Sequence, residues 1–186
     1  MPILGVIASA ISGNLVTGSY ESISTNTLSS NSNTVTISSI PSTYKHLQLR
    51  MFAKHSGGSG IADAIVTFNG DTGSNYTKSW TFTFDGGGPY TSRGTASSGF
   101  SMGYFANNGS TSLFGTFILD LVDYSNTNKY KTATYLNGVE KTSAGTTTVV
   151  HGTGSWLNTA AISSISINCG DAISAGSTFA LYGIKG

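Results

Sequence analysis

Apolar and polar residues alternate along most of this chain, and a period of two is typical of β-strands that bury one face. The segment Lys45–Met51 shows the pattern most clearly, because Leu47, Leu49 and Met51 alternate with polar residues. Helical periodicity is almost absent. Similar apolar stripes occur at Val35 and Ile37, at Ala64, Val66 and Phe68, at Trp80, Phe82 and Phe84, at Phe117, Leu119 and Leu121, at Ile165 and Ile167, and over Thr178–Ile184.

Residues that favour turns separate these stripes. Glycine and asparagine cluster in segments 55–60, 69–73, 85–89 and 107–110, where they tolerate the positive φ angles of tight turns. Asn137-Gly138, after a predicted strand over Tyr130–Leu136, is the strongest single hairpin signal. Many short strands at a spacing of about 8–12 residues predict an all-β fold, an antiparallel β-sandwich that is jelly-roll-like.

We assign residues 20–186 to this single domain and residues 1–19 to an apolar N-terminal arm. The arm lacks the basic residues of a signal peptide, because Lys45 is the first basic residue of the chain. Its apolar stretch is also too short and too interrupted to cross a bilayer. We therefore interpret it as a segment for attachment or oligomer contact. Its apolar residues are Ile3, Leu4, Val6, Ile7, Ile11 and Leu15.

The amino-acid composition limits the classes of function that this chain can have. Charged residues are 9% of the chain, against roughly a quarter in an ordinary soluble domain. Acids, bases and metal ligands are therefore sparse, which argues against an enzyme. The net charge of +1 and the lack of a basic run give nucleic-acid binding little to work with, and we expect no membrane partner. Cys169 is the only cysteine, so we expect a small buried side chain and no intrachain disulfide.

Several motifs suggest chemistry, but each has a structural interpretation that we prefer. Asn69–Asn75 resembles part of a calcium loop, yet Asp71 is its only carboxylate, so a turn is expected. Asp120 and Asp123 lie at a spacing that places them on opposite faces of a strand. The three histidines, His46, His55 and His151, lie on separate segments. We expect them at solvated or strand-surface positions and predict no metal site.

Two further patterns resemble catalytic motifs only by their letters. Gly99–Gly103 matches the Gly-x-Ser-x-Gly elbow of esterases, but that elbow needs a following helix, and a turn follows here. Asp85–Pro89 is glycine-rich but lacks the Lys-Ser/Thr pair of a phosphate loop. We therefore predict no catalytic residues and no cofactor.

Aromatic residues in or beside turns are the more useful signal. They can stack on sugar rings while neighbouring amides bind hydroxyls, they can anchor a protein interface, or they can seal the ends of the sandwich core. The sequence leaves these alternatives open. The candidates are Tyr76, Tyr90, Tyr104, Tyr130 and Trp156.

Five segments together resemble small virion proteins of tailed bacteriophages, with those of cyanophages and marine phages closest. The resemblance covers about Tyr20 to Gly186, and it implies a β-sandwich on the particle exterior that is often trimeric. Members of this group are associated with capsid decoration or with tail and fibre parts. The segments are Ser39–Arg50, Phe68–Tyr76, Asp123–Thr132, Trp156–Ile165 and Phe179–Lys185.

The expected function is therefore that of a non-enzymatic virion structural protein. The first hypothesis is a capsid decoration (cement) protein on the exterior of a tailed phage. It would act as a homotrimer that bridges the major capsid protein and stabilises the shell. The alternative is a tail-fibre or baseplate module that recognises host surface glycans.

Overall fold

A computed structural model describes residues 19–57, 61–106, 112–140 and 147–186. The described residues form strands and no helix, which confirms the all-β prediction, and none of them forms a helix able to cross a bilayer. The strands are β1 (Tyr20–Thr27), β2 (Ser32–Ile37), β3 (His46–Ala53), β4 (Ala62–Phe68), β5 (Tyr76–Phe84), β6 (Gly87–Ser97), β7 (Phe100–Phe105), β8 (Gly115–Val122), β9 (Lys131–Val139), β10 (Thr148–Trp156), β11 (Ile165–Ile173) and β12 (Thr178–Ile184).

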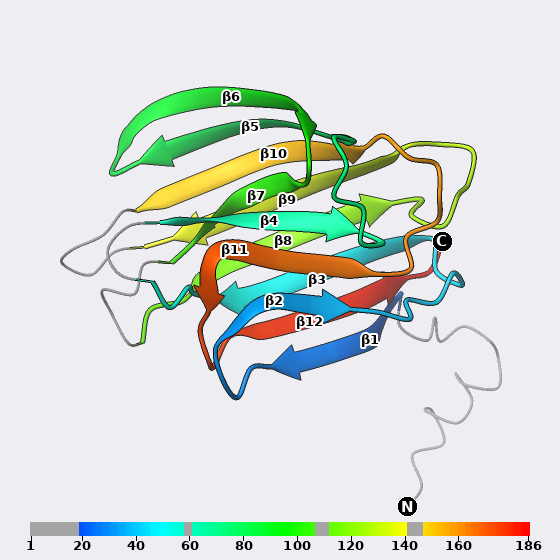
Figure 1. The fold of residues 1–186 in the computed structure, drawn as a ribbon, viewed down its shortest axis with the longest axis horizontal. Coiled ribbons are helices and arrows are strands. Elements are labelled where there is room, and N and C mark those ends of the chain that lie inside the picture. The colour runs from blue at the N-terminus through cyan, green and yellow to red at the C-terminus, as the bar shows by residue number, and fades with distance from the viewer. Residues whose placement is uncertain (1–18, 58–60, 107–111, 141–146) are drawn as a thin grey trace, which may run out of the picture.

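Two antiparallel sheets of unequal size pack face to face (Figure 1). The larger sheet has eight strands in the order β1-β12-β3-β8-β9-β10-β5-β6, and the smaller has four in the order β2-β11-β4-β7. From β1 to β5 each successive strand changes sheet, and the chain changes sheet again at β7, β8, β11 and β12. This repeated crossing makes the sandwich jelly-roll-like, with the β8-β9-β10 meander inserted between β3 and β5.

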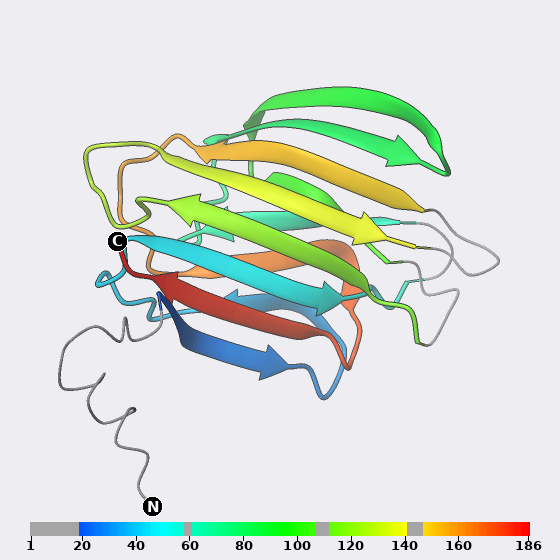
Figure 2. The same ribbon diagram turned by 180° about the vertical axis from the view of Figure 1, so that it is seen from behind.

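The alternating pattern accounts for the core between the sheets. On β3 the predicted inward residues Leu47, Leu49 and Met51 are all buried, and they lie opposite the predicted stripe on β8 in the antiparallel register. Burial of apolar side chains on alternate positions therefore fixes the register of the central strands. The outer face of the larger sheet carries no second layer of described strands (Figure 2).

The different widths of the two sheets leave the β5–β6 hairpin without full cover. The smaller sheet ends at β7, which packs against β9 and β10. In Figure 1 the hairpin projects beyond β7 at the top of the molecule. One end of the inner face of β5 therefore packs against both β4 and β7, whereas in the described part of the chain the other end packs only against Tyr104 of β7.

The predicted hairpin turn at Asn137-Gly138 is wrong, because both residues lie inside β9. Asn137 is fully buried between the sheets. Its Oδ1 accepts a hydrogen bond from the backbone N–H of Tyr104 (2.8 Å), and its Nδ2 donates to the carbonyl oxygens of Tyr104 (3.2 Å) and Thr116 (3.1 Å). Tertiary hydrogen bonds thus satisfy an amide that, in isolation, favours a turn.

Candidate functional site

Two of the five candidate aromatic residues belong to the core, so a sugar-binding or protein-contact role for them is wrong. Tyr76 and Trp156 are 0% and 1% exposed and stack with their ring centroids 6.4 Å apart. They pack against Phe68 of β4 and, for Tyr76, Phe100 of β7. With Tyr135 of β9, which stacks on Phe100, these residues form what we call the buried aromatic cluster. Both side chains seal the sandwich, one of the three roles left open by the sequence.

The turn at 69–75 supports this cluster. Asn69 and Gly70 adopt positive φ, as the turn prediction requires. The Asp71 carboxylate accepts hydrogen bonds from Trp156 Nε1 (2.7 Å), the Gly73 N–H (2.8 Å) and Asn75 Nδ2. The Trp156 bond, followed by those from Gly73 and Asn75, lowers the pKa of the Asp71 carboxyl. The one carboxylate of the calcium-like segment is therefore engaged in hydrogen bonds that hold the turn against the core.

Tyr90 and Tyr104, in contrast, come together in a second cluster at the other end of β5. Tyr90 is 50% exposed, whereas Tyr104, Phe82 and Phe84 are half-buried. Phe82 lies 5.6 Å from Tyr90 and 5.0 Å from Phe84, and Phe84 lies 5.5 Å from Tyr104, all measured between ring centroids. Trp80 contacts both Phe82 and Tyr104. We call Trp80, Phe82, Phe84, Tyr90 and Tyr104 the open aromatic cluster.

Strand register builds the open aromatic cluster. Phe82 lies opposite Tyr90 of β6, and Trp80 lies opposite Gly152 of β10. Gly152 in turn lies opposite Tyr135 of β9. A Cβ at Gly152 would lie 2.7 Å from both Tyr135 Cζ and Trp80 Cβ. Because Gly152 has no side chain, Tyr135 and Trp80 both fit beside it on the inner face of the sheet.

Three buried polar atoms at this cluster lack a hydrogen-bond partner in the described part of the chain: Trp80 Nε1, Tyr135 Oη and Thr148 Oγ1. Their residues are 6%, 2% and 0% exposed. Tyr135 and Trp80 meet over Gly152, and Thr148 lies opposite Phe84. Unpaired buried polar groups are uncommon because each costs about 1–3 kcal/mol.

The charges beside the open aromatic cluster are of both signs. The Lys78 ammonium lies 4.0 Å from the centroid of the Trp80 ring, a cation–π geometry. Burial lowers the pKa of Lys78, and the Asp63 charge opposes this effect. Burial, with a smaller contribution from Asp63, raises the pKa of Tyr104. Asp63 also accepts a hydrogen bond from Ser101 Oγ at 2.9 Å. Lys78 and Asp63 therefore place charges of opposite sign beside the cluster.

The sequence predicted the stripe Trp80, Phe82 and Phe84 but not its role. Alternation alone assigns these residues to the core face. The segment that follows could have distinguished these residues from fully buried core residues, because β6 is rich in glycine and polar residues and contains Pro89. Such a strand is typical of a sheet edge, where the inner face can lose its cover.

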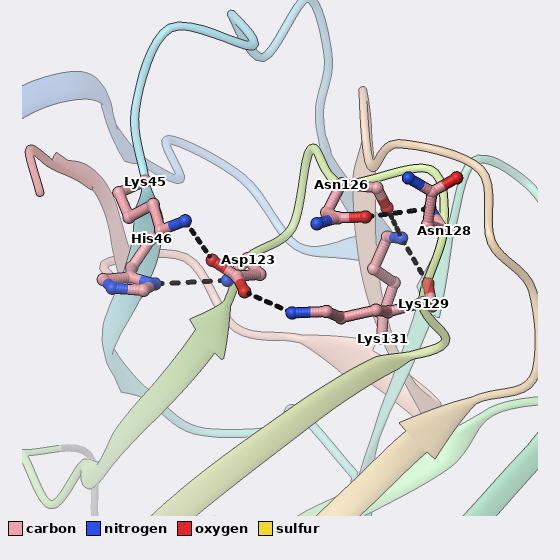
Figure 3. A network of polar contacts seen from close by, with 7 residues as sticks. All are labelled: Lys45, His46, Asp123, Asn126, Asn128, Lys129 and Lys131. Carbon is pink, nitrogen blue, oxygen red and sulfur yellow. Dashed lines mark hydrogen bonds and ion pairs between the residues drawn. The ribbon is translucent and has the colours of Figure 1, made fainter.

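Tyr130, the last candidate, lies apart from both clusters. It is 60% exposed in the loop between β8 and β9, next to the polar network of Figure 3. In this network the buried Lys131 ammonium donates to the carbonyl oxygens of Asn126, Lys129 (2.8 Å) and Thr159 (2.9 Å). Burial lowers the pKa of Lys131. The lysine therefore joins the β8–β9 loop to the β10–β11 loop.

Asp123 is the second centre of the Figure 3 network. Its carboxylate lies between the ammonium groups of Lys45 (2.9 Å) and Lys129 (3.2 Å), which lower its pKa. Its backbone N–H donates to Nδ1 of His46 at 3.1 Å. Asp120 instead accepts from Gln48 Nε2 on the outer face of the larger sheet. The two carboxylates thus have separate partners, and Asp123 lies in the turn beyond the end of β8 and not on a face of the strand.

The outer face of the larger sheet contains a shallow hollow of about 290 Å³. Arg50 Nε donates to Gln48 Oε1 at 2.7 Å, and Gln48 orients Asp120 at its floor. The hollow is lined by Gln48, Ile118, Asp120, Thr134, Tyr135, Leu136 and His151. Around it are exposed apolar residues on four adjacent strands: Phe52 (50%), Ile118 (36%), Leu136 (47%) and Val149 (49%). We call these four residues the outer apolar patch.

Two of the remaining reactive side chains meet at Asp171: His55 Nδ1 lies 3.5 Å from its Oδ2, and Cys169 Sγ donates to its backbone carbonyl oxygen at 2.7 Å. His151 is exposed on β10, as expected, but His55 is only 2% exposed, so its predicted surface position is wrong. His55 packs near Asp171 and accepts a hydrogen bond from the Gly57 N–H, which accounts for its burial. Cys169 is buried as predicted, and burial raises its pKa to about 11. No group of three or more His, Cys, Asp or Glu suited to a metal ion occurs among the described residues.

Residues 1–18 lie outside the described part of the chain, and this range includes all six apolar arm residues predicted for attachment. The first strand begins at Tyr20. No protein-family model matches this chain, and no curated protein or solved structure matches it.

Proposed function

We propose that this protein is a non-enzymatic structural component on the exterior of a tailed-phage particle, specifically a homotrimeric capsid decoration protein that bridges shell subunits. The observation that carries the proposal is the outer apolar patch. Single exposed apolar residues are ordinary on protein surfaces, but neighbours on four adjacent strands of an uncovered sheet are typical of a contact surface.

The chemistry of this face suits passive contact. Its central charged groups are linked through a neutral amide, because Arg50 donates to Gln48 Oε1 and Gln48 Nε2 donates to Asp120. The Arg50 guanidinium also lies 5.5 Å from the ring centroid of Tyr182. A partner that covered the outer apolar patch would bury half-exposed side chains at about 1 kcal/mol each. In this proposal the arm of residues 1–19 adds further attachment energy.

The resemblance to virion proteins supports the same proposal from the sequence. Four of the five segments that carry it overlap the loops between β2 and β3, β4 and β5, β8 and β9, and β10 and β11. These loops meet at one end of the sandwich, where Lys131 and Asp71 tie them together or to the core. These four segments therefore contribute to one end of the sandwich.

Quantitative mass spectrometry of purified particles, with electron cryomicroscopy, tests the assignment. A decoration protein is expected in hundreds of copies at regular lattice positions. Particles that lack the protein altogether would contradict a virion role. A handful of copies at the tail would favour the alternative, a receptor-binding part of the tail fibre or baseplate, for which the open aromatic cluster is the supporting observation.

The contact face is tested separately in solution and on particles. The double change Ile118→Lys with Leu136→Lys places two charges in the outer apolar patch and is expected to abolish attachment or trimer formation. Light scattering and particle co-sedimentation measure these effects. The matched control is Thr81→Lys on β5, which places one charge on the same face outside the patch. If the double variant and the control behaved equally, the outer apolar patch would not be the contact surface.

A further inference from the structure

The open aromatic cluster has the composition of a ligand site and not of a core. Five aromatic side chains gather where the smaller sheet ends, and three of them are half-buried. Below and beside them lie three buried polar atoms without partners in the described residues, Trp80 Nε1, Tyr135 Oη and Thr148 Oγ1. An ordinary core places apolar atoms at such positions, so the site combines flat apolar rings with unmet hydrogen-bonding capacity.

The size of the exposed region limits the occupant. Only Tyr90 of the five aromatic residues is more than a third exposed. A stable protein interface buries about 800 Å² on each partner and involves about 20–30 residues a side. The open aromatic cluster offers much less, so a small ligand suits it better than a second protein surface.

We propose that the open aromatic cluster binds neutral carbohydrate, with one or two sugar rings stacked on Tyr90 and Phe82. The apolar face of a pyranose packs on aromatic rings, and its hydroxyls both donate and accept hydrogen bonds. This matches the buried atoms, since an indole N–H only donates and tyrosine and threonine hydroxyls do both.

The charges around the site favour a neutral ligand. Lys78 is a cation beside the site, and its ammonium is already placed over the Trp80 ring at 4.0 Å. The Asp63 carboxylate acts on both Lys78 and Tyr104 with the opposite sign. An acidic sugar would meet this carboxylate, and a cationic ligand would meet the ammonium. The inference goes beyond the proposed structural role and holds for a capsid or a tail protein alike.

The test uses the purified full chain and three neutral probes: cellohexaose, maltohexaose and N-acetylchitohexaose. Saturation-transfer-difference NMR detects binding, and isothermal titration calorimetry measures it. We expect at least one probe to bind, with the strongest saturation on ring C–H protons. Tryptophan emission gives an internal reference, because Trp80 lies in the site and Trp156 in the buried aromatic cluster. The emission change on binding should disappear in Trp80→Phe.

Variants separate stacking from apolar docking. Tyr90→Ala is expected to weaken binding about tenfold. Tyr90→Leu, which keeps apolar bulk but removes the ring, is expected to weaken it to a similar extent. The matched control is Tyr130→Ala, which removes another exposed tyrosine (60%, against 50% for Tyr90) away from the cluster and should leave affinity unchanged. Circular dichroism melting confirms that each variant is folded.

Other results would overturn the inference. No binding of any neutral probe would do so, as would unchanged affinity in Tyr90→Ala. Binding confined to an acidic probe, hexagalacturonate, would contradict the neutral class. Self-association that Tyr90→Ala abolishes and Tyr90→Leu preserves would show that the open aromatic cluster is a protein interface instead.

Discussion

The two aromatic clusters of this protein share strand β5 and differ in what covers them. Tyr76 at the start of β5 belongs to the buried aromatic cluster, and Phe82 and Phe84 near its end belong to the open one. All three lie on the same face of the strand. Phe68 of β4 and Phe100 of β7 cover Tyr76, whereas the hairpin end extends beyond the smaller sheet. The width of the opposing sheet therefore decides which aromatic side chains become core.

The clusters also differ in how their polar atoms are satisfied. The Tyr76 hydroxyl accepts from the Phe68 N–H and donates to the Asp71 carbonyl oxygen, each at 2.9 Å, and Trp156 Nε1 donates to the Asp71 carboxylate. Trp80 Nε1 in the open aromatic cluster has no such acceptor among the described residues. Tyr135 Oη, at the Gly152 junction between the two clusters, also lacks a partner among the described residues. The unpaired atoms therefore lie toward the open aromatic cluster, which makes it the better candidate for an external ligand.

The largest expected effect comes from emptying the buried aromatic cluster. Trp156→Ala should lower the free energy of unfolding by about 3–5 kcal/mol, because it leaves a cavity between the sheets and removes the Asp71 hydrogen bond. Urea unfolding followed by circular dichroism measures the change. Trp156→Phe is the control, since it keeps most of the volume. A loss below 1 kcal/mol for Trp156→Ala would remove the distinction between the clusters.

Asn137 connects the open aromatic cluster to the core, and its loss should have the next largest effect. Asn137→Ala leaves the backbone N–H and carbonyl oxygen of Tyr104 without their side-chain partner, which we expect to cost about 2–3 kcal/mol. Asn137→Asp keeps the acceptor but loses the donor, so it tests the two halves separately. Denaturant midpoints and Trp80 emission report the result. Wild-type stability in both variants would show that Asn137 does not hold β7.

The stability that Asp71 contributes to the buried aromatic cluster depends on pH. Its carboxyl pKa is lowered in the folded protein, mainly by the Trp156 hydrogen bond. Its stabilising contribution is therefore complete above the unfolded value of about 4 and is lost as the pH falls through the lower folded value. Asp71→Asn should cost about 1 kcal/mol at pH 7. The melting temperatures of the two proteins should converge below about pH 4, and a constant gap would contradict this explanation.

The smallest expected effect on stability comes from a change in the open aromatic cluster. Tyr90→Ala should change the free energy of unfolding by less than about 0.5 kcal/mol, because the side chain is half-exposed on an edge hairpin. The same urea measurement used for Trp156→Ala allows direct comparison. A loss as large as that of Trp156→Ala would mean that Tyr90 is a core residue, and the carbohydrate proposal would lose its main platform.

Alternation in the sequence was enough to predict the class of fold and the faces of the central strands. Leu47, Leu49 and Met51 are buried as expected, because a period of two has only one arrangement that buries all three. The turn at Asn69-Gly70 and the burial of Cys169 were also predictable from local chemistry.

The predicted contact residues depended on information that no local pattern carries. Tyr76 and Tyr90 both stand beside turns, yet the first is buried and the second is 50% exposed. Asn137-Gly138 has the letters of a turn but lies in β9, because the interior offers Asn137 three backbone partners. The sequence alone determined which segments are strands and which of their faces is apolar. The tertiary structure decided which part of the apolar face was covered, because cover depends on strands that are distant in the chain and on the unequal widths of the two sheets.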